Sequence, residues 1–141
     1  MRKYLSDKRI LNEIKHGKYL AENNAEEIWG WETPAGKIRW KRRVQMLING
    51  ITPDMNVLEL GCGTGYFTKE LVKTNSKIIA IDISLELLKI AESNCYSDNV
   101  KFLCDNAYGT NFDDETFDVI VGSSVLHHLD IDKALKEIFR V

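Results

Sequence analysis

Three closely spaced glycines, Gly61, Gly63 and Gly65, are the residues whose spacing points most directly to chemistry. They follow the apolar run 57–60, and glycines at the end of a strand permit unusual backbone angles and leave a ligand room against the bare chain. Asp82 follows a second apolar run, where its carboxylate could accept hydrogen bonds from both hydroxyls of a ribose. The alternative for Asp82 is an ordinary turn residue at a strand end. Together the glycines and the carboxylate predict a site for a nucleoside-like ligand.

The residues around the glycines favour a cationic ligand over a phosphorylated one. A dinucleotide-binding loop needs a third glycine where Tyr66 stands, and no Gly-Lys-Ser/Thr follows as in a phosphate-binding loop. Glu59, two residues before Gly61, would repel a pyrophosphate but suits a ligand that carries an ammonium and a sulfonium. We therefore expect a cofactor with positive charge.

The elements that must position these residues form an alternating pattern of strands and helices, which is typical of a parallel sheet. Strands are expected at 57–60, 77–81, 100–104 and 117–122, and helices at about 65–74, 85–95 and 131–139. Ser84 and Asp130 are the expected caps of the last two helices. In the final helix the stripe Ile131, Leu135 and Ile138 should face inward.

The first part of the chain reads as helical. Ile10, Leu11 and Ile14 have helical spacing before Gly17, a residue that can end a helix. Thr33 and Pro34 predict the start of a second helix. Its apolar stripe should be Trp40, Val44, Leu47 and Ile48.

Composition limits the class of protein. The chain has 141 residues, of which 44% are hydrophobic and 28% charged, with a net charge of −2, as expected of one soluble domain. It has no apolar run long enough for a membrane span and no signal-peptide pattern, so we expect a cytoplasmic protein that does not contact membranes. The three cysteines lack the spacing of a zinc site or a disulfide framework, so we expect reduced thiols and no metal.

The runs VLELGCGTG, AIDIS, FLCDNA and FDVIVGSSVLHHL, in this order and spacing, resemble the successive motifs of class I S-adenosylmethionine-dependent methyltransferases. The resemblance covers about residues 52–141. It implies an α/β, Rossmann-like three-layer sandwich whose parallel sheet has the order 3-2-1-4 in this chain. It also implies an enzyme of class EC 2.1.1.-, with S-adenosylmethionine as cofactor and S-adenosylhomocysteine as product. A small molecule is the expected methyl acceptor.

The same resemblance implies roles for nine residues. Gly61, Gly63 and Gly65 would line the methionine and ribose part of the cofactor, while Glu59 would brace their loop and Asp82 would hold the ribose.

The remaining roles lie after the second, third and fourth strands. Ile83 would cover one face of the adenine, Asp105 would accept its amino group, and the Asn106 amide would reach a ring nitrogen. Ser123 would lie beside the methionine moiety. Because the carboxyl ends of parallel strands meet at one sheet edge, these residues should converge with Gly61 and Asp82. For Asp105 the alternative is a loop-capping role.

No catalytic residue is assigned. His127 and His128 are adjacent, so we expect their side chains to point in different directions and to serve a structural role, with His128 as a general base the alternative.

Two features of the N-terminal segment leave alternatives open. The basic run Lys37, Arg39, Lys41, Arg42 and Arg43 is interpreted as a solvated helix face rather than a nucleic-acid site, since no RNA-binding motif accompanies it. Trp29, Trp31 and Trp40, with Tyr19, indicate either a lid over the cofactor cleft or core packing. We divide the chain into a helical lid, 1–51, and a cofactor-binding domain, 52–141.

The chain holds material for four of the seven strands that the resemblance implies, so we expect a fragment that stops before strands five to seven. The fourth strand would then be an unprotected apolar edge through which two copies could dimerise. Two other functions remain open, a nucleotide-binding oxidoreductase and a non-enzymatic module that senses the cofactor.

Overall fold

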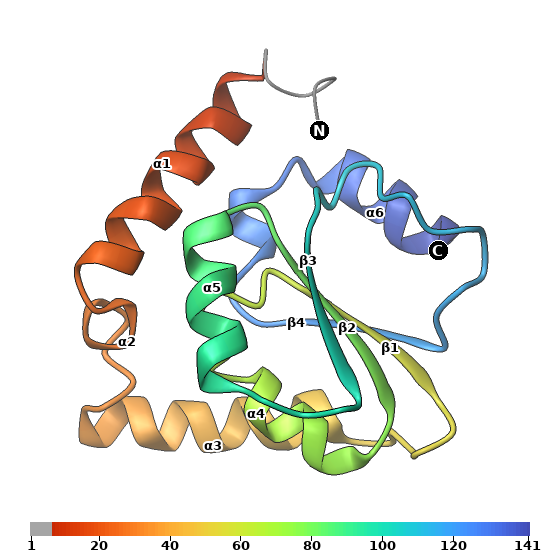
Figure 1. Ribbon diagram of the computed structural model, residues 1–141, viewed down its shortest axis with the longest axis horizontal. Coiled ribbons are helices and arrows are strands. Elements are labelled where there is room, and N and C mark those ends of the chain that lie inside the picture. Colours follow the sequence, from red (N-terminus) through yellow and green to blue (C-terminus); the bar gives the residue numbers. More distant parts are fainter. Residues whose placement is uncertain (1–6) are drawn as a thin grey trace.

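A four-stranded parallel sheet with the order β3-β2-β1-β4 forms the centre of the protein. The computed structural model describes residues 7–141, and Figure 1 shows the sheet with helices around it. The strands are β1 (Asn56–Leu60), β2 (Lys77–Asp82), β3 (Val100–Cys104) and β4 (Val119–Gly122). The helices are α1 (Lys8–Glu22), α2 (Ala25–Ile28), α3 (Pro34–Ile48), α4 (Thr68–Leu71), α5 (Leu85–Asn94) and α6 (Ile131–Arg140). The expected parallel order is confirmed.

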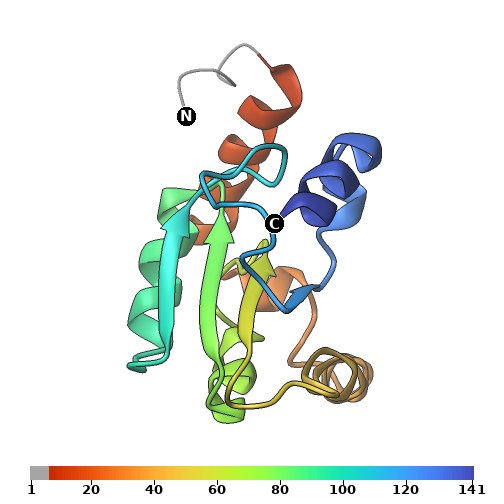
Figure 2. The ribbon, with the colours of Figure 1, turned by 90° about the vertical axis from the view of Figure 1, so that its right-hand side faces the viewer.

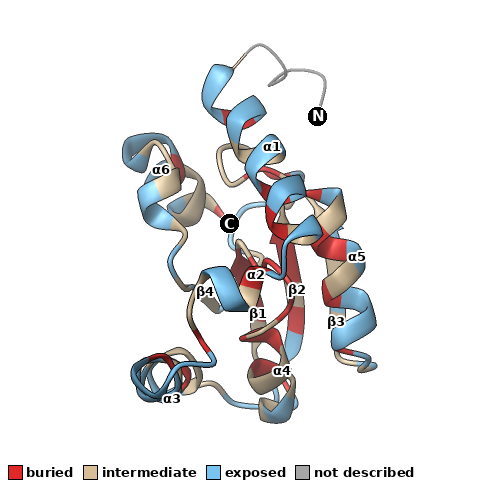
Figure 3. Ribbon diagram, turned by 90° about the vertical axis from the view of Figure 1, so that its left-hand side faces the viewer, coloured by how far each residue is buried: buried red, intermediate tan, exposed pale blue. Residues whose placement is uncertain are grey.

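The core follows the two-residue period of the strands, with α5 on one side of the sheet and α6 on the other (Figure 2). Leu58 and Leu60 of β1 point to one face, where they pack with Ile138 of α6. Val57 points to the opposite face and packs with Leu71 of α4. Both faces of β1 are therefore covered, which explains why this strand reads as nearly continuous apolar sequence. Figure 3 shows the buried residues concentrated on β1 and β2.

The sequence predicted that the first helix ends at Gly17, but α1 continues to Glu22. A Cβ on Gly17 would lie 2.4 Å from the Cβ of Ser84. The glycine therefore serves close packing between α1 and the residues that follow β2, and it does not terminate the helix. Helix α3 begins as expected, because the Thr33 side chain accepts a hydrogen bond from the Gly36 amide.

Two expectations about the later helices are wrong. In α6 the fully buried residue is Ala134, whereas Ile131 and Leu135 are exposed and Ile138 alone of the predicted stripe joins the core. The helix expected at 65–74 is reduced to α4 and a 3-10 turn at Val72–Thr74, because the glycine loop continues as turns up to Phe67. The caps Ser84 and Asp130 are confirmed.

All three cysteines are free thiols, as expected. Within residues 7–141 no helix is long and apolar enough to cross a membrane.

Candidate functional site

A pocket of about 540 Å³ lies at the carboxyl ends of the strands. This volume is within the range of sites for small ligands and cofactors. Seven of the nine residues predicted from the sequence line it, namely Gly61, Gly63, Asp82, Ile83, Asp105, Asn106 and Ser123. Glu59 and Gly65 do not. The convergence expected from parallel strands therefore exists in the structure.

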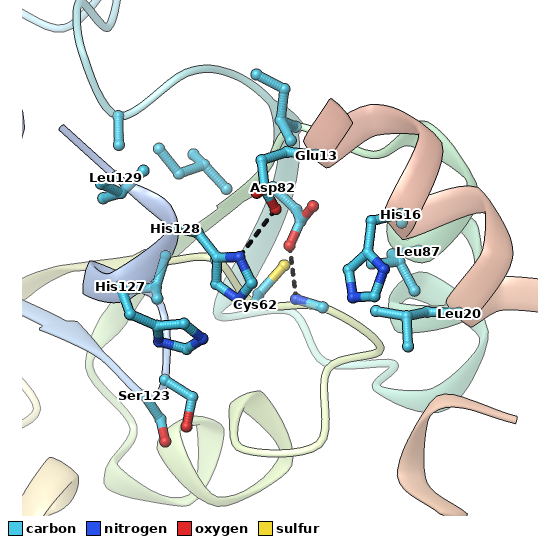
Figure 4. Close-up of a pocket in the computed structure, with 18 of the residues that line it drawn as sticks. Glu13, His16, Leu20, Cys62, Asp82, Leu87, Ser123, His127, His128 and Leu129 are labelled. Carbon is cyan, nitrogen blue, oxygen red and sulfur yellow. Dashed lines mark hydrogen bonds and ion pairs between the residues drawn. The ribbon is translucent and has the colours of Figure 1, made fainter. Parts of the chain in front are cut away.

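Asp82 points toward the glycine loop. Its Oδ2 accepts a hydrogen bond of 2.9 Å from the Gly63 amide (Figure 4). Its Oδ1 accepts one of 2.9 Å from the Ser84 amide. Burial raises the pKa of Asp82, and these two bonds oppose that rise. Each carboxylate oxygen keeps a further lone pair, so the side chain can accept two more hydrogen bonds from a ligand.

The glycine loop owes its composition to protein packing as well as to any ligand. Gly61, Gly63 and Gly65 all have positive φ, the left-handed region that other residues rarely adopt. A Cβ on Gly61 would lie 2.6 Å from Val125, and one on Gly63 would lie 3.1 Å from the Trp29 ring. A Cβ on Gly65 would press on Ala91 of α5 at 3.2 Å. Three neighbouring elements thus approach the loop where side chains are missing.

Glu59 lies beneath the loop instead of in the pocket. It is 4% exposed and accepts a hydrogen bond of 2.6 Å from Thr68 of α4. Burial raises the pKa of Glu59 to about 7. Its position agrees with a bracing role, but its carboxylate is partly protonated near neutral pH, so the sequence argument that it directly repels a pyrophosphate is weakened.

The raised pKa of Glu59 makes the stability of the fold depend on pH. The folded protein holds the Glu59 proton up to about pH 7, whereas the unfolded chain loses it near 4.5. The free energy of unfolding should therefore fall by about 3 kcal/mol as the pH rises through this range.

Urea unfolding of the wild type and of Glu59→Gln between pH 4 and 8 measures this effect. The glutamine keeps an acceptor for Thr68 and cannot ionise. The unfolding free energy of the variant, relative to that of the wild type, should therefore increase as the pH rises. A pH-independent difference between the two proteins would contradict the buried carboxyl.

The residues after β3 and β4 complete the strand-end side of the pocket. Asp105 accepts a hydrogen bond from the backbone amide of Asn106, and Asn106 is buried with no hydrogen-bond partner for its Nδ2 among the described residues. Ser123 accepts a hydrogen bond of 3.3 Å from Arg43. The side-chain oxygens of Asp105 and Ser123 can accept hydrogen bonds from a ligand that carries polar hydrogens.

Residues 58–141, more than half of the chain, match the family described as "Methyltransferase domain". The chain belongs to this family.

Sequence relatives agree with this assignment. The chain is 33% identical over 109 residues to a demethylmenaquinone methyltransferase of Lactococcus lactis, covering 72% of this chain and 43% of that protein. It is 34% identical over 89 residues to a malonyl-[acyl-carrier protein] O-methyltransferase of Bacillus cytotoxicus, covering 61% and 31%. The chain thus spans less than half the length of these curated relatives.

Among solved structures, the fold superposes on the N-methyltransferase NodS of Bradyrhizobium japonicum, solved in complex with S-adenosyl-L-homocysteine. The TM-score is 0.76 at 19% identity, over 90% of this chain and 66% of NodS. The YcgJ protein of Bacillus subtilis gives a TM-score of 0.66 at 25% identity, over 74% and 46%. The α/β fold of the methyltransferase domain is shared with both.

Elements outside the matched methyltransferase domain also build the pocket. One face of α1 lines it, through Arg9, Ile10, Glu13, His16, Gly17 and Leu20. The spacing of these residues follows the three- and four-residue steps of a helix face. The sequence shows this spacing, but only the apolar residues were used to predict the helix.

The adjacent histidines also differ from the expectation. The rings of His127 and His128 lie 3.9 Å apart, instead of pointing in different directions, because a 3-10 turn at Leu126–His128 brings them together. His128 Nδ1 lies 3.0 Å from Glu13 of α1, which ties that helix to the segment after β4 (Figure 4). Among residues 7–141, no group of three or more histidine, cysteine or acidic side chains could hold a metal ion.

Part of the basic run in α3 faces the pocket. Lys41 and Arg42 are exposed, as expected of a solvated face, but Arg39 and Arg43 line the pocket beside Trp31. Arg39 is still exposed, so the interpretation as a solvated face is wrong only for the half-buried Arg43. The three tryptophans also lie in different surroundings. Trp29 and Trp31 line the pocket, Trp40 packs against Val44 and Tyr66 in the core, and Tyr19 is 54% exposed.

Proposed function

We propose that this chain binds S-adenosylmethionine in the pocket at the strand ends, and that the whole protein transfers its methyl group to a small acceptor. The observation that carries the proposal is the carboxylate of Asp82, held at the glycine loop with acceptor capacity to spare. A ribose with two adjacent hydroxyls matches that capacity. Asp105 and Asn106 would recognise the adenine, Ile83 would cover one of its faces, and Ser123 would contact the methionine moiety.

The chemistry asked of the protein is modest. When bound, S-adenosylmethionine supplies a methyl group on a positively charged sulfur, with a neutral leaving group. The residues of this chain then have to orient the ligand and exclude water, effects that lower a barrier by positioning. The aromatic walls Trp29 and Trp31 are suited to excluding water. A general base is needed only if the acceptor carries a proton, and His128, oriented by Glu13, is the candidate for that role.

Calorimetric titration with S-adenosylhomocysteine and, separately, with NAD⁺ tests the proposal against an oxidoreductase. Binding of S-adenosylhomocysteine and no binding of NAD⁺ is the expected result. The opposite preference would remove the proposal. A non-enzymatic sensing role is distinguished by methyl transfer from labelled S-adenosylmethionine to a pool of acceptors, assayed with the whole protein.

The comparisons favour small or carrier-bound acceptors, since the similar proteins are named for demethylmenaquinone and for a malonyl group on a carrier protein. We also propose that residues 1–51 act as a lid, because α1 and α3 line the pocket. Nucleic acid is not an expected partner, and a cytoplasmic location is expected. β4 pairs only with β1 among the described strands, so a homodimer through its free edge remains a prediction.

A further inference from the structure

All three histidines of the chain line the pocket, although they come from distant parts of the sequence. His16 belongs to α1, whereas His127 and His128 follow β4. The rings of His16 and His128 are stacked with their centres 6.3 Å apart (Figure 4). Imidazole is the side chain that ordinarily changes its charge between pH 5 and 8. The cluster is therefore a place where pH can act on the contact between α1 and the segment after β4.

One acidic side chain contacts the cluster directly. His128 Nδ1 lies 3.0 Å from Oε2 of Glu13, and this is the one ion pair within residues 7–141 that involves a histidine. The side chains of His128 and Glu13 are 36% and 29% exposed, so solvent screens the pair only in part. A proton on His128 turns a hydrogen bond from a neutral ring into a contact between opposite charges, and the attraction increases.

Helix α1 is anchored differently along its length. Its second half packs on α5 and its cap through Gly17 and Leu20. Its first half lines the pocket through Ile10 and Glu13. Packing of glycine and of apolar side chains does not depend on pH, whereas the contact of Glu13 with His128 does. The first half of α1 is thus the part of the helix whose docking responds to a proton.

The other charges around the pocket decide the direction of the response. They are Arg9 and His16 of α1, Asp82 and Asp105 at the ends of β2 and β3, His127, and Arg39 and Arg43 of α3. The pKa of Asp82 is raised mainly by burial and further by the negative charge of Glu13. A docked α1 therefore brings two carboxylates toward each other, and a positive charge on His128 offsets their repulsion. Because the ring centre of His127 is 3.9 Å from that of His128, a second proton there is opposed by the first.

We propose that the pair Glu13–His128 is a pH-sensitive latch that holds the first half of α1 against the turn after β4. A proton on His128 strengthens the latch, and loss of that proton as the pH rises weakens it. The inference deepens the proposed function, and its consequence for ligand binding rests on that function. The docking of α1 itself can be measured without a ligand.

Hydrogen exchange of backbone amides at pH 6 and pH 8 tests the latch in the whole protein without ligand. After correction for the intrinsic effect of pH on exchange, residues 11–15 of the wild type should be about three- to tenfold better protected at pH 6. Residues 18–22, in the half of α1 that packs on α5, should change less. In His128→Gln and in Glu13→Gln, the pH dependence of residues 11–15 should be lost.

His127→Gln is the matched control. It removes an imidazole from the same turn, but one that forms no ion pair within residues 7–141, so the pH dependence of α1 should remain. The wild type, His128→Gln and His127→Gln all keep Glu59, whose burial raises its pKa to about 7 and makes the whole fold respond to pH. That response is common to the three proteins and cancels when they are compared.

Two exchange results would overturn the latch. One is equal protection of residues 11–15 at both pH values in the wild type. The other is a pH dependence that survives in His128→Gln, whether or not His127→Gln loses it. Neither result touches the proposed function, because no ligand is present.

A titration with S-adenosylhomocysteine then links the latch to the pocket. The wild type should bind this ligand more tightly at pH 6 than at pH 8, by a larger factor than His128→Gln does. Equal factors in the two proteins would mean that the latch does not control the pocket, and the inference would fail. A wild type that binds no S-adenosylhomocysteine at either pH would remove the proposed function, whereas the exchange result would still decide whether the latch exists.

Discussion

Replacement of Asp82 by alanine is expected to weaken the binding of S-adenosylhomocysteine by about 2–4 kcal/mol, or roughly 30- to 1,000-fold. The carboxylate would supply two charge-assisted hydrogen bonds to the ribose. It also accepts hydrogen bonds from the amides of Gly63 in the glycine loop and of Ser84 after β2, so its loss leaves both donors unpaired. Isothermal calorimetry measures the change directly.

A control variant and a ligand analogue test whether Asp82 contacts the ribose. Asp98→Ala removes an exposed carboxylate that does not line the pocket, and its affinity should equal that of the wild type. For a 2′-deoxy analogue of S-adenosylhomocysteine, Asp82→Ala should reduce the binding affinity less than it does for the natural ligand. The reason is that the analogue already lacks one of the two ribose hydrogen bonds. Equal losses with both ligands would contradict contact between Asp82 and the ribose.

Gly61→Ala is expected to lower the free energy of unfolding by about 2–5 kcal/mol. Two costs add in this variant. A residue with a side chain costs about 1–2 kcal/mol at a left-handed φ, here 65°, and a Cβ placed 2.6 Å from Val125 adds an overpacking cost of about 1–3 kcal/mol. The new methyl group also pushes on the segment that carries Ser123. Urea unfolding measures the first effect and nucleoside binding the second.

Gly50→Ala measures the backbone cost by itself. Gly50 has a φ of 80°, but nothing lies within 4 Å of the position of its Cβ, so this variant bears the backbone cost alone. Gly61→Ala combined with Val125→Ala should recover part of the additional loss after allowance for the Val125→Ala change itself. If the Gly50 and Gly61 variants were equally destabilised, the contact with Val125 would have no energetic weight.

The sheet and the strand-end residues could be predicted from the sequence because both depend on short-range patterns. Helices separate β1 from β2 and β2 from β3. Asp82 ends β2, and Asp105 and Ser123 directly follow β3 and β4. Parallel topology then brings them to one edge, whatever the details of packing. The caps Ser84 and Asp130 are equally local, since a cap acts within three residues of itself.

The other wall of the pocket could not be predicted from the sequence, because it depends on how separate elements dock. Gly17 looked like a helix end, and only the approach of Ser84 explains why a glycine stands in mid-helix. Arg43 belongs to a basic run, and only its position over Trp31 distinguishes this half-buried residue from exposed Lys41. Likewise, the outer face of α6 carries apolar residues at helical spacing that the structure leaves exposed.

The single face that α1 presents to the pocket has a kinetic consequence. A nucleoside bound at the strand ends would be covered on its outer side by one helix of 15 residues, docked through Gly17 and through the contact of Glu13 with His128. Release of the spent ligand past α1 would require this helix to detach. Product release, rather than methyl transfer, would then limit the turnover of such an enzyme. Weaker docking of α1 would speed release and lower the affinity for the ligand.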